Sequence, residues 1–459
     1  MYGRLIILLL SCSAIFVFGT VNNLRDQDNL DSIDGIDRGD NKLHTHVFKE
    51  HLPGLSSRTD IIKQGRVHKD LPHKVIFATK LNNMDELRSI LHDVSDPSSP
   101  NYGQHMTREE VTDLTSNPEA RDVVVSYLNL IGASITSITL GGEYITANAS
   151  IAVWERMFQT EFYTFHQTHI GDRVGKVVRA EKYSIPRELD LHIETVFNII
   201  NIYQVSHGKL QPMKTPHETK GKAIILQDNP GTPEWQEYHT ITPYKLKLYY
   251  NMSNNVRGVN FSTQAVYATN NLFFSPADGV AFRTMAGLPQ QTIKYIKNVN
   301  DTRCIQNSNW CGESMLDLEY IMAMSPLSPT TYWYVDLDFI DWIIQVAKIV
   351  NPPRVFSISY GHIEDTTDKG GRVIFNQEAI KLGAMGVTIF AATGDDGAPS
   401  REGACRYSAN YPTVSPYVTA VGGTSVSGNK FLLSISYCNC IDIHSLSETC
   451  RVLSLISRR

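Results

Sequence analysis

An alternation of apolar strands and helices in the second half of the chain constrains the fold most strongly. Residues at helical spacing predict helices at 339–350 and 373–385. Apolar runs between and after them predict strands at 354–360, 387–392 and 417–421. Strands that alternate with helices in this way form a parallel sheet with helices on both faces. We therefore predict an α/β domain over residues 241–430.

A smaller domain of mixed strands and helices precedes it, at residues 73–205. Thr107 and Glu110 have the spacing of a capping box, and Asn117 followed by Pro118 marks another helix start, which Gly132 ends. Periodicity and turn residues predict a strand at 73–81, helices at 84–94 and 151–159, and hairpins at 134–150 and 162–179. This pattern indicates an α+β domain.

Three other segments lack such patterns. Residues 20–72 are polar, begin with an aspartate-rich run and are expected to be a flexible lead-in. Residues 206–240 are expected to be a linker, because they are rich in Lys, Pro, Gly and His without periodicity. Residues 431–459 form an atypical tail that is rich in Ser, Leu and Ile.

The N-terminus predicts export. Arg4 precedes an apolar run from Leu5 to Phe18, and the small residue Gly19 stands at a plausible cleavage edge, so residues 1–19 are expected to be a signal peptide. The run is shorter than the roughly 20 residues that span a bilayer, which disfavours a membrane anchor. Glycosylation sequons, weak support for export, occur at Asn148, Asn251, Asn260 and Asn300. A lysosomal or extracellular protein is expected, with no membrane contact after cleavage.

The charge of the chain argues against nucleic acid as a partner, and its length indicates more than one domain. The formal net charge is -5 and no run of basic residues occurs, so nucleic acid is not expected as a partner. A chain of 459 residues exceeds what one core usually serves, which agrees with two domains.

The cysteines suggest an oxidising compartment. Cys304 and Cys311 bracket a short loop and are expected to form a disulfide. A zinc site is the alternative, but the spacing differs from Cys-x-x-Cys and the loop holds no His. The partner of Cys405 stays open, and Cys438, Cys440 and Cys450 crowd into the tail.

Glu313 and Asp317 lie four residues apart, so one turn of a helix would place both carboxylates on one face. The surrounding residues are apolar almost all round such a helix. Two acids one turn apart repel each other, and burial without a partner would raise a pKa or destabilise the fold. A functional pair is one interpretation. The other is a solvent-facing helix whose acids complement the N-terminal dipole.

Several separate motifs resemble one family. Residues 95–111, Ser-Asp-Pro-Ser-Ser-Pro-Asn-Tyr-Gly-Gln-His-Met-Thr-Arg-Glu-Glu-Val, are similar to the activation-propeptide signature of the sedolisins, the serine-carboxyl peptidases. Further family-like stretches follow in family order at 241–251, 313–317, 357–361, 394–397 and 412–425. The resemblance extends from about residue 73 to residue 425. It implies a subtilisin-like parallel sheet preceded by a ferredoxin-like α+β prodomain.

The resemblance also implies roles for the acids. Glu313 matches the general base, Asp317 the acid that orients it, and Asp395 the protonated acid that donates a hydrogen bond to the oxyanion. A coupled pair of carboxylates and a protonated acid suit work at acidic pH. On turn chemistry alone, Asp395 in Gly-Asp-Asp-Gly would be an ordinary turn residue.

The segment at 357–361 resembles the strand edge that holds a peptide substrate by main-chain hydrogen bonds. The residues concerned are Ser357, Ser359, Tyr360 and Gly361. The other reading of this segment is a plain buried strand. The expected partners are therefore peptide or protein substrates and the chain's own prodomain.

The chain departs from the family near its end. The family nucleophile lies in a Ser-Gly-Thr-Ser motif downstream of residue 425, and its calcium loop lies further on, so neither is expected among these 459 residues. Ser425 and Ser427 are rejected as nucleophiles, because they directly follow an earlier strand and no clear helix follows them. We therefore expect an incomplete sheet with exposed apolar edges and, as a result, poor solubility. The tail is expected to be translated intron, and a genuine alternative terminus is the other explanation.

A protein of another class is the rival hypothesis. In it the chain is catalytically inactive, and the prodomain acts as an inhibitor or folding chaperone of a related protease. Everything that this activity needs lies within residues 73–205.

Overall fold

The computed structural model describes residues 45–56, 58, 60–170, 173–202, 242–252, 262–269, 272–296, 301–306, 311–335, 339–364, 367–394, 410–422, 424–427 and 430–433. The signal peptide, the whole linker at 206–240, Cys405, the tail beyond residue 433 and the sequons at Asn260 and Asn300 lie outside these residues.

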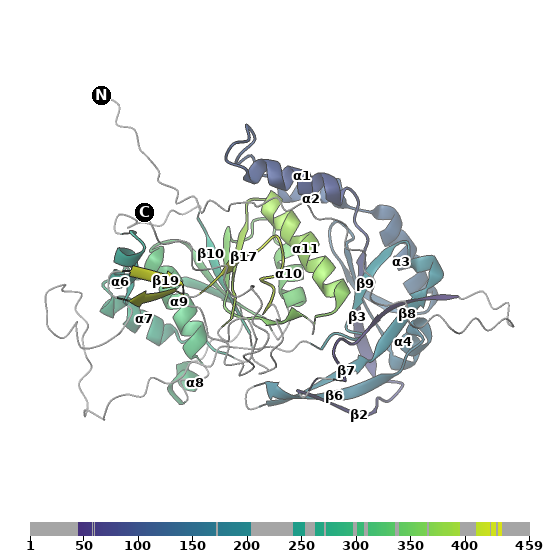
Figure 1. The fold of residues 1–459 in the computed structure, drawn as a ribbon. Coiled ribbons are helices and arrows are strands. Elements are labelled where there is room, and N and C mark those ends of the chain that lie inside the picture. Colours follow the sequence, from purple (N-terminus) through teal and green to yellow (C-terminus); the bar gives the residue numbers. More distant parts are fainter. Residues whose placement is uncertain are drawn as a thin grey trace, which may run out of the picture. The chain divides into compact units, whose positions relative to one another are not determined.

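A six-stranded parallel sheet forms the second half (Figure 1). Its strand order is β11 (Ile293–Ile296), β12 (Thr330–Tyr334), β10 (Gln264–Ala268), β13 (Val355–Ile358), β15 (Thr388–Ala392) and β17 (Thr419–Val421). All five neighbouring pairs are parallel. The predicted α/β domain with a parallel sheet is confirmed.

Helices cover both faces of this sheet, as predicted. Ala265 and Tyr267 of β10 pack into a core with α10 (Phe339–Ala347) and α11 (Lys369–Ala384). Val266 and Ala268, which alternate with them, pack on the opposite side with α9 (Gly312–Met324). Three further helices belong to this half: α6 (Pro243–Tyr249), α7 (Pro276–Met285) and α8 (Asp301–Gln306).

The β15–β17 end of the sheet is less well covered. Phe390 on β15 is 36% exposed and Val421 on β17 is 48% exposed, although both are apolar residues of a parallel sheet. Exposed apolar side chains at a sheet edge favour association between chains. The expected low solubility therefore stays a prediction with a structural basis.

The first half contains a four-stranded antiparallel sheet. Its order is β4 (Ser134–Ile138), β5 (Tyr144–Ser150), β3 (Pro72–Thr79) and β9 (Ile193–Phe197). The helices are α1 (Met84–Ser95), α2 (Arg108–Thr115), α3 (Pro118–Leu130) and α4 (Ile151–Phe158), with a short 3-10 helix η1 (Arg187–Leu189). The predicted capping box of Thr107 and Glu110 is present, and Asn117 caps α3.

The flexible lead-in was a wrong prediction for part of its length. β1 (His46–His51) pairs with β8 (Lys182–Pro186), and β2 (Ile61–Arg66) pairs with β6 (Phe162–Ile170), which also pairs with β7 (Arg173–Ala180). These early strands are short, largely polar edge strands. Their order comes from backbone hydrogen bonds to strands more than a hundred residues away, and local periodicity does not report such pairing.

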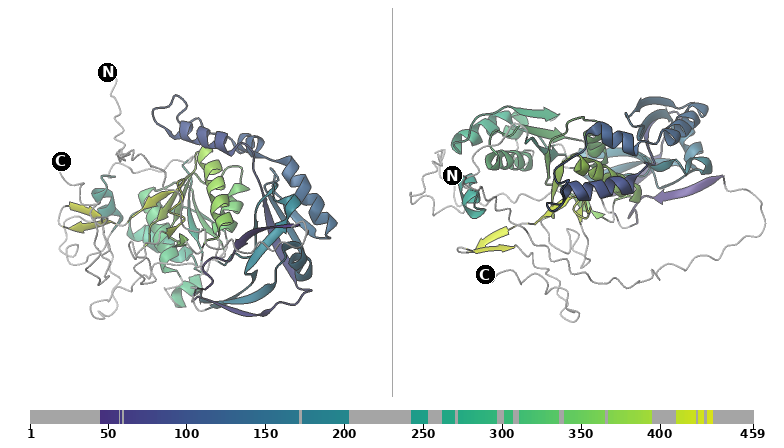
Figure 2. Two further views of the ribbon diagram at one scale, coloured as in Figure 1. Left: turned by 45° about the vertical axis from the view of Figure 1, so that its right-hand side comes forward. Right: turned by 90° about the horizontal axis from the view of Figure 1, so that it is seen from above.

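The four-stranded sheet is buried on both faces. Val75 and Phe77 of β3 point into a core shared with α3 and α4. Ile76 and Ala78, on the other face, pack in the same core as Phe375 of α11. On the neighbouring surface, α1 and α2 lie against the C-terminal end of α11 (Figures 1 and 2). The first half therefore buries one face of this sheet against α11.

A buried ion cluster lies at this contact. The Lys381 ammonium of α11 donates to Glu143 at 3.1 Å and to Glu378 at 2.9 Å, and the Tyr144 hydroxyl donates to Glu378 at 2.7 Å. Lys381 is 1% exposed and Glu378 is 0% exposed. Arg108 adds a second buried cation, whose Nη2 donates to the Ile349 carbonyl at 3.3 Å.

Burial and charge act in opposite directions on these groups. Burial alone would raise the pKa of Glu143, but the Lys381 charge and the Thr139 hydroxyl outweigh it, so the pKa lies below its ordinary value of 4.5. Burial lowers the pKa of Lys381, and Glu378 and Glu143 more than restore it. The stability that Glu143 contributes is present above pH 4.5 and is lost as the pH falls through its lower folded pKa.

We predict that Lys381→Met lowers the free energy of unfolding by about 3–5 kcal/mol, because it leaves two buried carboxylates without their cation. Denaturant titration at neutral pH measures the change. Lys49→Met is the matched control, since the Lys49–Asp190 ion pair has the same 3.1 Å separation and is more exposed. It should lower stability by about 0–1 kcal/mol. Equal losses in the two variants would contradict this account of the cluster.

Candidate active site

Glu313 and Asp317 occupy successive turns of α9, as the sequence predicts. Met315, Leu318 and Met322 of the same helix are buried against the sheet. The helix therefore presents its acids beside the apolar face that anchors it. Glu313 is half-buried.

The Asp317 carboxyl is enclosed. The Ser359 hydroxyl donates a hydrogen bond to Oδ1 at 2.6 Å. Its Oδ2 atom is buried and has no hydrogen-bond partner among the atoms that the structure describes. Burial, and then the charge of Glu313, raise the pKa of Asp317 from 3.8 to about 8, while the Ser359 hydrogen bond lowers it in part. The solvent-facing interpretation is wrong for this acid.

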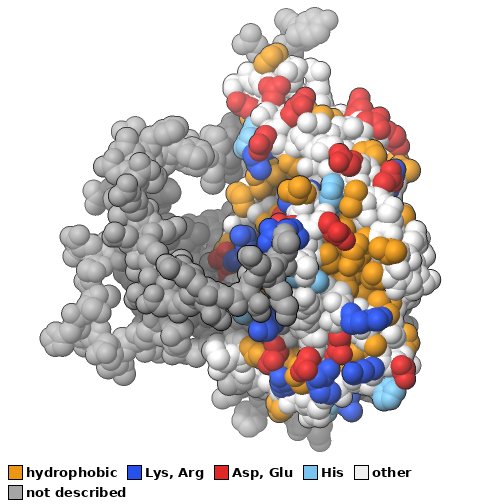
Figure 3. Space-filling model, turned by 90° about the vertical axis from the view of Figure 1, so that its right-hand side faces the viewer, with side chains coloured by type: hydrophobic (Ala, Val, Ile, Leu, Met, Phe, Trp, Pro, Cys, Tyr) orange, Lys and Arg blue, Asp and Glu red, His pale blue; other side chains and the backbone are white. Residues whose placement is uncertain are grey.

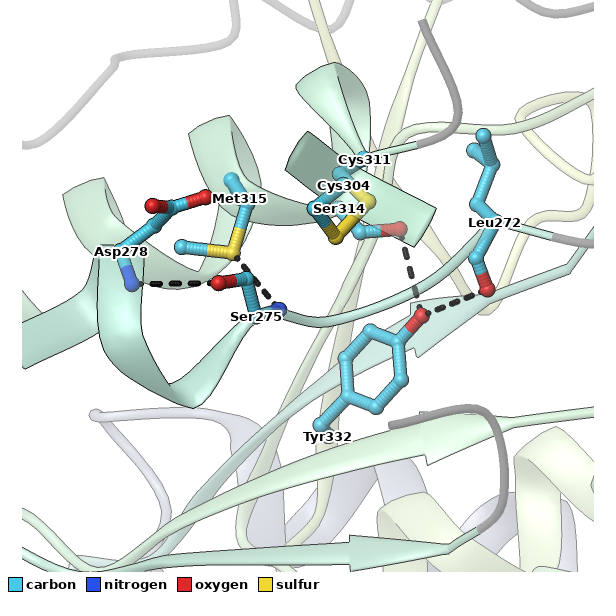
Figure 4. Close-up of a disulfide and its surroundings, with 8 residues drawn as sticks. All are labelled: Leu272, Ser275, Asp278, Cys304, Cys311, Ser314, Met315 and Tyr332. Carbon is cyan, nitrogen blue, oxygen red and sulfur yellow. Dashed lines mark hydrogen bonds between the residues drawn. A yellow bond between two sulfur atoms is a disulfide. The ribbon is translucent and has the colours of Figure 1, made fainter. Parts of the chain in front are cut away.

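The start of α9 is fixed by several contacts (Figure 4). The predicted disulfide joins Cys304 of α8 to Cys311, the residue just before α9, with a Cα–Cα distance of 5.4 Å. The Tyr332 hydroxyl of β12 lies 3.2 Å from both the Leu272 carbonyl and Ser314 Oγ. Because Ser314 follows Glu313 directly, these contacts restrict where the Glu313 backbone can lie.

The four predicted substrate-contact residues differ in their settings. Ser357 lies inside β13, between β10 and β15, so its backbone is not at a sheet edge as expected. Tyr360 is 1% exposed and belongs to the core. Ser359 and Gly361 follow the carboxyl end of β13 and are half-buried. Only the segment beyond the strand retains the geometry that the prediction requires.

Asp395 lies outside the described residues. The strand that leads to it is described: β15 runs beside β13, with Ala391 opposite Ile358, and the chain reaches Gly394 two residues after its end. Ser425 and Ser427 lie on β18 (Thr424–Ser427), which pairs with β19 (Lys430–Leu433) in an antiparallel hairpin. Neither serine stands at the start of a helix.

Sequence reasoning missed one contact made to α9 and one further acid on it. The side chain of Ser359 contacts Asp317, whereas the sequence pattern suggested a main-chain role for this residue. Glu319 is a third partly enclosed acid, and burial and the charge of Asp278 raise its pKa from 4.5 to about 8 while Arg283 lowers it. The i, i+2 spacing from Asp317 is the only local signal for Glu319, and it places that side chain on another side of the helix.

Other surfaces offer no second centre in the described part of the chain. A cavity of about 370 Å³ lies in the first half, among residues of α4, β6 and β8, and not at the acids; its lining is Glu155, Gln159, Thr160, Glu161, Tyr163, Glu181 and Lys182. Basic and acidic side chains are mixed on the face shown in Figure 3. Within the described ranges, no group of three or more His, Cys, Asp or Glu residues could hold a metal. No helix there is long and apolar enough to cross a bilayer.

Comparisons with known proteins give consistent matches. Residues 59–202 match the family model "Pro-kumamolisin, activation domain". Tripeptidyl-peptidase 1 of Rattus norvegicus is 26% identical over 387 residues, which cover 81% of this chain and 65% of the relative. The Homo sapiens protein is 26% identical over 380 residues, covering 79% and 63%. The chain thus spans about 65% of the length of the curated relatives it matches.

Two solved structures are also similar to the chain. Pseudomonas sedolisin, a serine-carboxyl proteinase, has 18% identity and a TM-score of 0.32, covering 40% of this chain and 54% of that one. Fervidolysin from Fervidobacterium pennivorans has 9% identity and a TM-score of 0.30, covering 81% and 46%.

We predict that Asp317→Asn flattens the pH dependence of stability. The folded pKa of Asp317 is raised, so wild-type stability is present below pH 3.8 and is lost as the pH rises through about 8. Between about pH 5 and pH 9 the variant should lose about 4 kcal/mol less than wild type in denaturant titrations, because the folded and unfolded states differ by one bound proton over about three pH units. Asp122→Asn is the control, because the Arg121 hydrogen bond holds the Asp122 pKa below its ordinary value, outside this window. Parallel stability curves for wild type and Asp317→Asn would refute the prediction.

Proposed function

The chain belongs to the sedolisin family of serine-carboxyl peptidases and carries the family's activation propeptide, and we propose that it is the zymogen of an acid-acting peptidase. The observation that carries this proposal is the enclosed pair of acids on α9, with Asp317 held by Ser359. A half-buried carboxyl beside an enclosed carboxyl with a raised pKa suits proton transfer.

Glu313 acts as the general base in this proposal and Asp317 orients it. Glu313 is half-buried and can exchange protons with a bound substrate, whereas Asp317 is enclosed and retains its proton to about pH 8. One carboxyl is therefore available to accept a proton while the other stays neutral beside it. This division of roles keeps a single negative charge on the pair.

Asp395 is proposed as the oxyanion donor, and the segment from Ser359 to Gly361 as the place where a peptide backbone lies. Support for both comes from the parallel strands β13 and β15, which end side by side just before these residues. Ligands in open α/β sheets bind at the carboxyl ends of the strands. A protonated Asp395 would donate a hydrogen bond to the developing oxyanion.

The nucleophile is proposed to be a serine from a Ser-Gly-Thr-Ser segment, which the printed 459 residues do not contain. The family's calcium loop is likewise expected downstream of residue 425. The described residues supply no cluster of metal-ligating side chains, so no step is assigned to calcium. Hydrolysis then proceeds through a serine acyl-enzyme, with Glu313 accepting the hydroxyl proton.

The finer assignments of fold and compartment are also proposals. The strand order β4-β5-β3-β9, fully antiparallel, supports a ferredoxin-like prodomain. The Cys304–Cys311 disulfide supports an oxidising compartment, in the lysosome or outside the cell. Of the sequons in the described chain, Asn251 is exposed and Asn148 is half-buried.

The inhibitor or chaperone hypothesis is not favoured. The prodomain match ends at residue 202, but the similarity to tripeptidyl-peptidase 1 covers 81% of the chain and therefore includes the acids. Peptides and the chain's own prodomain are the proposed partners.

We predict that full-length transcripts continue in frame past the codon for Gly428 into a Ser-Gly-Thr-Ser motif. The encoded protein, activated at acidic pH, should cleave a fluorogenic peptide, and Glu313→Gln should lower kcat at least about a hundredfold through loss of the base. Glu319→Gln is the matched control: it lies on the same helix and also has a raised pKa. It should leave kcat within about threefold of wild type.

Two outcomes would count against the peptidase proposal. Transcripts from several tissues that all end in the present tail would remove the nucleophile from this gene product. Equal losses of kcat in Glu313→Gln and Glu319→Gln would show that α9 tolerates no neutralised acid, and that Glu313 has no special role.

A further inference from the structure

Among the residues that the structure describes, the Ser359 hydroxyl donates the one side-chain hydrogen bond that Asp317 accepts. Ser359 follows β13 on the sheet, and Asp317 lies on α9, which covers one face of that sheet. The bond therefore joins the two elements on which the proposed site is built. Its O–O distance of 2.6 Å is within the ordinary range of O–H···O hydrogen bonds.

The two oxygens of Asp317 differ in their surroundings. A serine hydroxyl that donates to Oδ1 makes this oxygen an acceptor, in the neutral acid as well as in the carboxylate. The proton of the neutral acid must then reside on Oδ2. That atom is buried and has no hydrogen-bond partner among the described atoms.

Helix geometry directs the Asp317 side chain toward Glu313. Side chains of an α-helix tilt toward its N-terminus, so residues i and i+4 lie one above the other on the same face. Glu313 stands one turn before Asp317 on α9. A proton on Oδ2 is thus placed on the side of the carboxyl that Ser359 leaves free.

We infer that Ser359 is a positioning residue that holds Asp317 by Oδ1 and so fixes its proton on Oδ2, available to Glu313. This inference rests on the proposed function, because it assigns Glu313 as the base. When Glu313 accepts a proton from a nucleophile, Asp317 keeps its own, and the pair passes from one negative charge to none. Ser359 contributes by orientation and does not exchange a proton itself.

Of the other titratable groups near Asp317, the two tyrosines are neutral where it titrates, and Glu313 is the one that bears a charge. Glu313 faces it from its own helix, Tyr332 from β12, and Tyr360 from the segment beyond β13. Burial raises the pKa of both tyrosines above their ordinary value of 10. A change in the titration of Asp317 after substitution of Ser359 therefore reports on the hydroxyl and on Glu313.

The test is a carboxyl titration of the full 459-residue chain. Asp side chains are labelled with ¹³C at Cγ, and the Asp317 resonance is assigned with Asp317→Asn. Ser359→Ala removes a donor that stabilises the ionised form, so the Asp317 midpoint should rise by about one pH unit. Ser415→Ala, which removes a 2.7 Å hydroxyl bond to Asn376 on the opposite side of the sheet, should leave the midpoint unchanged.

A second pair of variants isolates the hydroxyl from packing. Thr and Val have nearly the same shape, but only Thr carries a hydroxyl, so Ser359→Thr should keep the wild-type midpoint and Ser359→Val should shift it upward. This pair decides the matter if Ser359→Ala does not fold. Identical midpoints in the Thr and Val variants would overturn the inference, as would an unchanged midpoint in folded Ser359→Ala.

The titration separates this inference from the proposed function. It needs no turnover and no nucleophile, so a shifted midpoint supports the role of Ser359 even in a chain without peptidase activity. If the peptide assay succeeds while the midpoint stays fixed in Ser359→Val, the peptidase proposal stands and the positioning role is lost.

Discussion

The contact between the first half of the chain and α11 is the interaction on which the rest of the structure depends. Lys381 lies between Glu143 and Glu378, and Tyr144 completes the set of hydrogen bonds. The cluster is buried, so each charge needs its partners to offset desolvation. The same helix packs on the parallel sheet, which links the prodomain to the strands that end at the site.

Small residues allow this close contact. A Cβ atom at Gly370 would lie 2.0 Å from the Thr195 hydroxyl oxygen, and one at Gly383 would lie 2.7 Å from a methyl carbon of Leu91. Glu50 of β1 also accepts hydrogen bonds from the first backbone amides of α11. The helix is thus enclosed at its start, along its length and near its end by residues of the first half.

The acids of the molecule respond to their surroundings in opposite ways. Burial and the like charge of Glu313 both disfavour the ionised form of Asp317, so its pKa is raised and it stays neutral. Glu143 is also buried, but Lys381 faces it, and its pKa is lowered so that it stays ionised. At acidic pH the first group keeps its state while the second approaches protonation. The site and the prodomain contact therefore have different pH dependences within one fold.

The sequence by itself determined the elements and the chemistry that local patterns report. Helix caps at Thr107 and Asn117, the rhythm of strands and helices, the Cys304–Cys311 pair and the acids one turn apart on α9 all depend on residues close in the chain. The tertiary structure alone decided that β1 pairs with β8 and β2 with β6, that Lys381 is buried, and that Ser359 donates a hydrogen bond to Asp317. Each joins residues distant in sequence, 42 positions apart for Ser359 and Asp317 and 238 for Lys381 and Glu143. The hydrophobic periodicity of a segment does not predict such contacts, because they depend on how separately formed elements pack.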